Sequence, residues 1–155
     1  MNGQPVQGSR QVSVSRVIAA DPATIFAVLV DPAQHAVIDG SGTVQRAKGD
    51  DETLRMGSRF SMGMRIGMPY VIKNEVVEFE QDRLIAWQHL GRHRWRYRLE
   101  PTEGGTRVIE TFDWSTARFP LGIELLGYPS KHPAGMERTL ERLDRLVTTG
   151  SAEAP

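Results

Sequence analysis

Two residues with the types and spacing for acid–base chemistry are His35 and Asp39, which lie four positions apart in residues 31–42. On a helix, residues four apart share a face, so the carboxylate could orient the imidazole as a general base. Ser41 lies nearby, but no G-x-S-x-G elbow surrounds it, and Asp-Gly and Ser-Gly pairs are typical of turns. We take His35 and Asp39 as candidate catalytic residues, with turn capping by Asp39 as the structural alternative.

Glu110 is a further ionisable candidate, and its role depends on strand register. If Glu100 pairs with Thr106, Glu110 lies outside the sheet opposite Arg96, as a cross-strand ion pair. A one-residue shift moves Glu110 inside, where burial would raise its pKa and suit it to acid or base catalysis. We favour the outside pair because burying an unpaired charge is costly. The facing of Trp114, which has the same strand parity, stays open.

Aromatic and methionine side chains form the candidate binding surface. Alternation in residues 93–100 places Trp95 and Tyr97 on one face and arginines on the other, and residues 58–66 alternate apolar side chains in the same way. Such faces serve as core or as the wall of a cavity, and methionine adapts to irregular ligands. His89 is also explained as a strand residue with a satisfied ring. The candidate ligand-binding residues are Phe60, Met62, Met64, Tyr70, Trp87, His89, Trp95, Tyr97, Phe112 and Trp114.

Composition narrows the class of protein. The 155 residues include 19 basic and 19 acidic side chains, so the net charge gives no support for nucleic acid or an anionic membrane surface as partner. There is no cysteine, which excludes disulfides and thiolate catalysis. The four histidines lack metal-ligand spacing, and no P-loop or G-x-G-x-x-G occurs, so we expect neither metal nor cofactor. No apolar signal core or membrane span is found, so we expect no membrane insertion and a cytoplasmic location.

The periodicity of hydrophobic residues, together with helix-starting and chain-breaking residues, predicts the helices and strands that position these side chains. Alternation predicts a strand over 11–18, with a slip near Arg16. Asp21-Pro22 and Asp31-Pro32 each predict a helix start, because Asp caps an orphan amide and Pro lacks one. An apolar stripe predicts a helix over 133–148, after an irregular stretch over 116–132. Six further strands are expected at 43–48, 58–66, 70–80, 83–90, 93–100 and 106–115.

These elements predict one α+β domain over 11–149, flanked by flexible tails at 1–10 and 150–155. A curved antiparallel sheet of about seven strands would wrap a long C-terminal helix, with two short helices after the first strand. The chain resembles the helix-grip superfamily of START and Bet v 1-like domains, and within it bacterial polyketide cyclase/dehydrase-like proteins. The resemblance rests on VSVSRVI, DPATIFAVLVDPAQH and RLIAWQHL…WRYRLEPTEGGTRVIETFDW. It implies a cavity between sheet and helix.

Two functions compete. The first is a carrier or sensor that binds a small, largely apolar molecule, lipid-like or polyketide-like. The second is a cyclase or dehydratase in which an acid–base residue works in the same cavity. Residues 119–128 are too apolar for a free loop, and would cover the cavity mouth, pack on the domain or form a homodimer patch.

Overall fold

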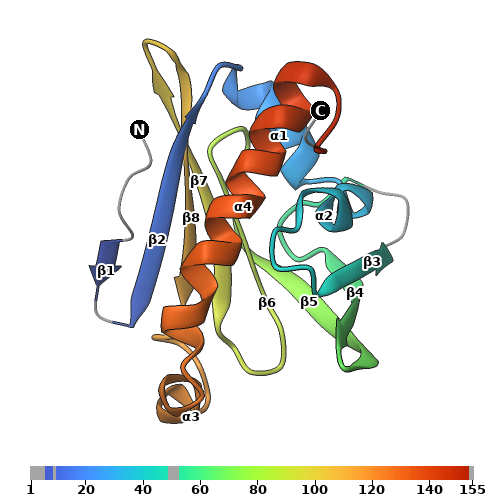
Figure 1. Cartoon of the computed structure of the whole chain (residues 1–155), viewed down its shortest axis with the longest axis vertical. Helices are drawn as coiled ribbons and strands as arrows, with labels where there is room; N and C mark the ends of the chain where they lie inside the picture. The colour runs from blue at the N-terminus through green and yellow to red at the C-terminus, as the bar shows by residue number, and fades with distance from the viewer. Residues whose placement is uncertain (1–5, 9, 49–52, 154–155) are drawn as a thin grey trace.

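The computed structural model describes residues 6–8, 10–48 and 53–153 of the chain. One strongly curved antiparallel sheet crosses the molecule, and a long helix lies along its concave face (Figure 1). This confirms the predicted α+β helix-grip fold; the sheet has eight described strands, against about seven expected. The strands are β1 (Val6–Gly8), β2 (Gln11–Ile18), β3 (Val44–Lys48), β4 (Arg59–Ile66), β5 (Met68–Glu80), β6 (Leu84–Gln88), β7 (Arg94–Thr102) and β8 (Gly105–Asp113). The helices are α1 (Pro22–Leu29), α2 (Pro32–Ile38), α3 (Pro120–Leu125) and α4 (Tyr128–Thr149).

The strand order is β1-β2-β8-β7-β6-β5-β4-β3. Strands β3 to β8 follow one another as hairpins, whereas β2 pairs with β8. The chain leaves β2 through α1 and α2 and enters the far edge of the sheet at β3, so these two short helices lie across the open side (Figure 1). Residues 6–8, which fall in the expected N-terminal tail, pair with β2.

Both Asp-Pro pairs start helices, as the sequence predicts. The Asp21 carboxylate accepts a hydrogen bond from the Thr24 amide at 2.7 Å, and the Asp31 carboxylate accepts one from the Ala33 amide at 3.0 Å. Pro22 and Pro32 occupy the first turn, where a missing amide proton costs nothing. The local sequence therefore sets the position of both helices.

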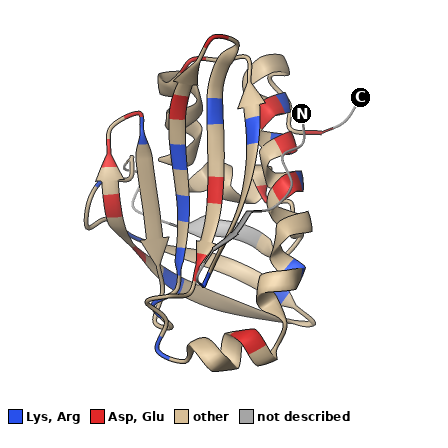
Figure 2. Cartoon of the chain, turned by 90° about the vertical axis from the view of Figure 1, so that its left-hand side faces the viewer, with Lys and Arg blue, Asp and Glu red and all other residues tan. Residues whose placement is uncertain are grey.

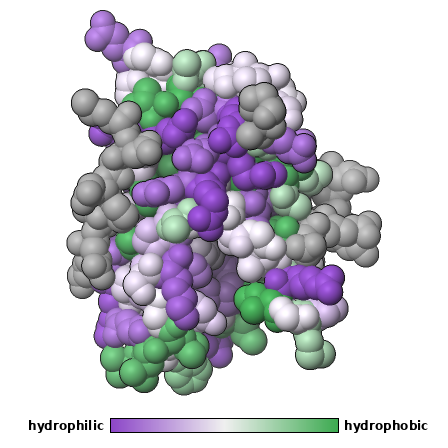
Figure 3. Space-filling model, in the orientation of Figure 1, coloured by the Kyte–Doolittle hydropathy of each residue, from purple (hydrophilic) through white to green (hydrophobic). Residues whose placement is uncertain are grey.

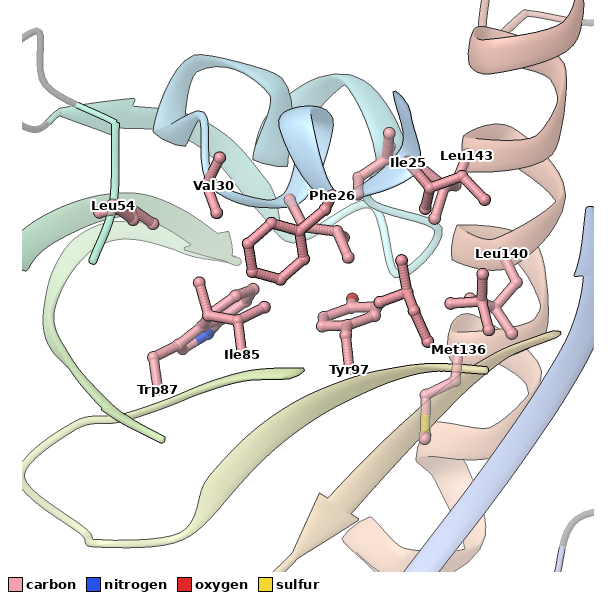
Figure 4. Packing of buried hydrophobic residues seen from close by; sticks show 14 of the residues in the cluster. Ile25, Phe26, Val30, Leu54, Ile85, Trp87, Tyr97, Met136, Leu140 and Leu143 are labelled. Atoms are coloured by element: carbon pink, nitrogen blue, oxygen red, sulfur yellow. The ribbon is translucent and has the colours of Figure 1, made fainter. Parts of the chain in front are cut away.

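The core lies between the concave face of the sheet and the helices. The predicted stripe of α4 supplies Met136, Leu140 and Leu143, each at most 2% exposed. They pack with the buried face of α1 and with inward side chains of the strands, and Figure 4 shows this layer around the ring of Tyr97. Complete burial of one such aliphatic side chain contributes about 1.5–3 kcal/mol. The core thus connects α4 to α1 and to the concave face of the sheet.

The prediction that residues 116–132 are irregular is wrong. Residues 120–125 form α3, and α4 begins at Tyr128 rather than at 133, with Pro133 inside the helix. One proline removes a single helical hydrogen bond. The early turns are held by packing, because the His132 ring lies 4.6 Å from Phe112 and 5.1 Å from Trp95, centroid to centroid. Tertiary contacts therefore override the local signal.

The predicted slip near Arg16 is also wrong. The pairing of β2 with β8 is continuous from Gln11 to Ile18. Arg16 shares its face with buried Val14 and Ile18, and its guanidinium donates to the Asp144 carboxylate of α4 at 2.7 Å. A charged residue sits on the inner face here because α4 supplies its partner at the edge of the core.

Gly40 marks a close approach between the α2–β3 connection and α4. Its amide donates to the Thr139 hydroxyl at 2.9 Å, and that hydroxyl donates to the Gly135 carbonyl at 3.0 Å. A Cβ at Gly40 would overlap the backbone of Thr139 and Gly135. Only glycine allows this contact without displacing the helix.

We therefore expect Gly40→Ala to lower the free energy of unfolding by about 1–3 kcal/mol, the usual cost of overpacking. Urea denaturation measures the change. Gly104→Ala is the matched control, because the nearest atom to its added Cβ would be 3.9 Å away. Equal effects of the two substitutions would contradict the assignment of Gly40 to a tight contact.

Candidate functional site

The register between β7 and β8 determines which side chains meet in the interior. Thr102 pairs with Gly105, so the hairpin has a two-residue turn at Glu103 and Gly104. This register places Tyr97 opposite Glu110. The preferred placement of Glu110 outside the sheet is therefore wrong: it is 3% exposed and lies on the concave face. The two-residue turn containing glycine was the signal that could have predicted this register.

The Arg96 side chain has other partners on the convex face. Its guanidinium donates to both carboxylate oxygens of Glu78, at 3.0 and 2.7 Å, and to Asp113 at 3.3 Å. Arg94 adds a bond to Glu78 at 2.9 Å. The outward charges thus neutralise one another and leave Glu110 without a cation.

Tyr97 and Glu110 form a buried hydrogen-bonded pair. The phenol of Tyr97 donates to Oε1 of Glu110 at 3.0 Å, and Oε2 of Glu110 has no hydrogen-bond partner. Burial raises the pKa of Glu110 to about 8, against the lowering effect of the Tyr97 hydrogen bond, with a further rise from the Asp39 charge. Burial also raises the pKa of Tyr97 well above 10. At neutral pH most Glu110 carboxyls therefore carry a proton, which is available on Oε2.

His35 lies in the same interior, stacked on an aromatic ring. Its imidazole is 4.8 Å from Trp87, nearly parallel, and 5.3 Å edge-to-face from Phe60. Nε2 lies 2.9 Å from the Leu29 carbonyl, and Nδ1 has no partner. Because a carbonyl only accepts, Nε2 is the donor and the neutral ring presents Nδ1 as an acceptor. Burial lowers the pKa of His35, which favours this neutral form.

The structure does not bring His35 and Asp39 side chains into contact. The helix ends at Ile38, and Asp39 is its C-cap. The Asp39 carboxylate accepts from the Ser41 hydroxyl at 2.7 Å and from the Val44 amide at 3.0 Å. These bonds match the turn-capping alternative, and a catalytic role for Asp39 stays a prediction.

Asn74 is a site residue that sequence reasoning missed. It pairs directly with Phe60 across β4 and β5, so both side chains point to the concave face. Asn74 is 5% exposed, and its Nδ2 has no hydrogen-bond partner. The signal that could have found it is strand alternation, because Asn74 lies between Lys73 and Glu75 and shares a face with Ile72 and Val76.

The predicted ligand-binding residues fall into two groups. Most are buried in or packed against the core along the concave face: Phe60, Met62, Met64, Trp87, Trp95, Tyr97, Phe112 and Trp114. Tyr70 is 39% exposed, and His89 is half-buried. The indole of Trp114 donates to Glu124 at 2.9 Å, so its nitrogen faces α3. Ligand contact by these residues remains a prediction.

A histidine cluster, defined as His89, His93 and His132, lies beside Trp95 and Phe112. The His89 and His93 ring centroids are 4.0 Å apart, and His132 stacks on Tyr128 at 5.4 Å. Burial lowers the pKa of both His93 and His132 to about 4, and for His93 its two histidine neighbours add to the effect. Among the described residues, no group of histidine, aspartate or glutamate has the arrangement of a metal site. Burial also lowers the pKa of His89, so the neutral form of all three rings is favoured, and the cluster packs against the rings of Trp95 and Phe112.

A concave sheet that wraps a long helix over an aromatic interior defines the START-like helix-grip fold. Residues 9–148 match the family described as polyketide cyclase / dehydrase and lipid transport, and the chain belongs to this family. That match spans every element from β2 to nearly the end of α4.

Several known proteins are similar to this chain. Uncharacterized protein Rv0088 of Mycobacterium tuberculosis strain H37Rv is 38% identical over 153 residues, which cover 94% of this chain and 67% of that protein. A solution structure of a protein from Arthrobacter aurescens superposes with a TM-score of 0.72 at 15% identity, over 97% of this chain and 94% of that one. A crystal structure from Rhodobacter sphaeroides gives 0.69 at 23% identity, over 93% and 96%. These two structures support the fold alone.

The raised pKa of Glu110 makes a testable contribution to stability. A carboxyl whose folded pKa is about 8 binds its proton more tightly than the unfolded chain does, so its contribution is lost as the pH rises from about 4.5 to 8. The lowered histidine pKa values act in the opposite sense, because they remove stability as the pH falls below about 6.5. Glu110→Gln removes the first effect and keeps the second.

We expect the difference in free energy of unfolding, Glu110→Gln minus wild type, to rise by roughly 1 kcal/mol for each pH unit between pH 5 and 8. Urea denaturation of both proteins across this range measures the difference. Parallel pH profiles would contradict a buried, protonated Glu110.

Proposed function

We propose that the protein binds a small, largely apolar molecule between the concave face of the sheet and α4, as a carrier or sensor. The observation that supports this most directly is that three of the five buried side-chain polar atoms without a hydrogen-bond partner in the described part of the chain lie here: Nδ1 of His35, Nδ2 of Asn74 and Oε2 of Glu110. They come from α2, β5 and β8, yet all belong to the same interior.

Such atoms are costly in a folded protein. Each buried polar atom left without a hydrogen bond costs about 1–3 kcal/mol, so most are satisfied. Three in one apolar interior are explained if a bound molecule supplies the missing partners. The three atoms differ in hydrogen-bonding role: the Asn74 amide and the protonated Glu110 carboxyl are donors, whereas Nδ1 of neutral His35 is an acceptor.

The surrounding surface suits an apolar body. The Trp87 ring lies 5.6 Å from Tyr97 and 5.6 Å from Phe60, and a second aromatic group joins Trp95 to Phe112 at 4.8 Å. Rings in this arrangement offer large apolar faces with few charges. A ligand with a planar or chain-like hydrocarbon body and one or two oxygen functions fits these partners. The description of the family, which names polyketide and lipid functions, is compatible with that class.

The neutral fluorescent probe N-phenyl-1-naphthylamine tests the binding site. We expect saturable binding at one site, with energy transfer from tryptophan, because Trp87, Trp95 and Trp114 all lie at or near the proposed interior. Trp87→Leu should weaken binding by about tenfold through the lost ring contact. Arg98→Leu on the exposed convex side is the control. Absence of saturable binding would contradict the proposal, and native mass spectrometry of freshly purified protein would reveal a co-purified ligand.

The Tyr97–Glu110 pair favours a second candidate, an enzyme of the cyclase or dehydratase type. A carboxylic acid with a pKa of about 8 stays protonated near neutral pH and can donate its proton to a substrate oxygen from Oε2. Tyr97 holds the other oxygen and so orients the acid. This arrangement replaces the pairing of His35 with Asp39 as the better-supported acid–base geometry.

If a co-purified molecule is converted by the protein, Glu110→Gln should lower kcat by roughly 100-fold or more, since general acid catalysis contributes at least that much. Glu78→Gln is the control, because Glu78 is a carboxylate on the opposite face of the sheet. Unchanged turnover in Glu110→Gln, or an equal loss in Glu78→Gln, would exclude Glu110 as the acid and leave the binding proposal standing.

A further inference from the structure

One end of the molecule carries most of its exposed large hydrophobic side chains. We call this the apolar end: the segment around α3, the β6–β7 loop and the β4–β5 hairpin tip, which lie from left to right across the lower end of the molecule in Figure 1. Ten of the thirteen such residues in the described part of the chain belong to it, and Figure 3 shows green surface over α3 and over the hairpin tip. They are Ile66, Met68, Tyr70, Val71, Leu90, Phe119, Leu121, Leu125, Leu126 and Tyr128.

Tertiary contacts join the β6–β7 loop to the segment around α3. The Arg118 amide donates to the Gly91 carbonyl at 2.9 Å, and the Thr116 hydroxyl donates to the Arg92 carbonyl at 2.7 Å. Exposed apolar clusters of this extent mark interaction sites rather than ordinary surface.

The charge of this end differs from that of the whole chain. Residues 63–73, 89–93 and 115–132 contain five basic side chains and one acidic side chain, a formal charge of +4. The neutral chain therefore carries −4 elsewhere. The five basic residues are all exposed: Arg65, Lys73, Arg92, Arg118 and Lys131.

The single acid at the apolar end is already paired. The Glu124 carboxylate accepts bonds from Trp114 at 2.9 Å and from Arg10 at 3.2 Å. Figure 2 shows this one acidic segment on α3, whereas several acidic segments lie along the upper half of α4. The apolar end is therefore both hydrophobic and cationic.

We propose that the apolar end is a docking surface for an anionic lipid bilayer. Exposed leucine, methionine and aromatic side chains enter the boundary between headgroups and acyl chains, while lysine and arginine pair with anionic headgroups. A second copy of the chain is the less favoured occupant, because a twofold contact would bring two +4 surfaces together. Docking is peripheral: no described helix is long and apolar enough to cross a membrane.

Co-sedimentation with lipid vesicles tests this surface without knowledge of any ligand. We expect the full chain to bind vesicles of phosphatidylcholine containing about one third phosphatidylglycerol, and to bind pure phosphatidylcholine much more weakly. Binding should weaken at high salt, because headgroup pairing is screened. Met68→Glu with Leu125→Glu should lower the partition coefficient by about tenfold or more, since both apolar contact and charge are lost. These side chains are 76% and 87% exposed, so the core is untouched.

The matched control is Val17→Glu with Met56→Glu, which changes two exposed hydrophobic residues outside the apolar end by the same charge. Vesicle binding by this control at the wild-type level supports the proposal. No binding of the wild type to anionic vesicles at low salt, or an equal loss in the control, would overturn it. A wild-type dimer that Met68→Glu with Leu125→Glu converts to monomer would also overturn it, in favour of a second copy. Retained binding of N-phenyl-1-naphthylamine by the variant shows that the fold and the proposed interior site are intact.

Discussion

The register of the β7–β8 hairpin is the constraint on which the interior depends. With Thr102 opposite Gly105, the concave face receives the pairs Trp95–Phe112 and Tyr97–Glu110 in succession. The same register sends Arg96 to the convex face, where Glu78 and Asp113 neutralise it. A shift by one residue would exchange the two faces of β8 and expose its apolar side chains. The hydrophobic requirement of the core therefore holds Glu110 inside, even though a carboxyl there is costly.

The cost of burying the Glu110 carboxyl determines its protonation state. The Glu110 carboxyl is stable in the core in its protonated form. Its pKa of about 8 is raised because ionisation in the buried site costs more free energy than in water. The phenol of Tyr97 satisfies one oxygen, while the second oxygen, the Asn74 amide and the His35 ring nitrogen have no partner. An interior selected only for stability would favour apolar residues at these three positions. Their presence supports the proposal that a bound molecule supplies the missing partners.

Local signals in the sequence predicted most of the elements, and non-local pairing decided the site. Asp21 and Asp31 cap their helices because a cap needs only residues within three positions. The facing of Glu110 depends on the register between β7 and β8. The inward facing of Asn74 follows from alternation with Ile72 and Val76, but its position opposite Phe60 depends on the pairing of β4 with β5. His35 and Asp39 are four positions apart, as residues on one helix face are, but α2 ends at Ile38. The Asp39 carboxylate instead accepts a hydrogen bond from the Ser41 hydroxyl in the following turn. The start of α4 was missed because ring packing of His132, rather than its proline-containing sequence, stabilises it.

The net charge of the chain gives no sign of how the charges are distributed over the folded surface. The chain as a whole has equal numbers of acidic and basic residues, but a partner contacts only one surface. The fold places five exposed basic residues among the exposed hydrophobic side chains of the apolar end. The histidine cluster and Trp95 lie just inside that end, since His132 stacks on exposed Tyr128 and packs against Trp95. The aromatic interior is thus continuous with the apolar end through the first turns of α4. The proposed docking surface and the proposed binding interior therefore meet at His132, whose ring contacts both Tyr128 and Trp95.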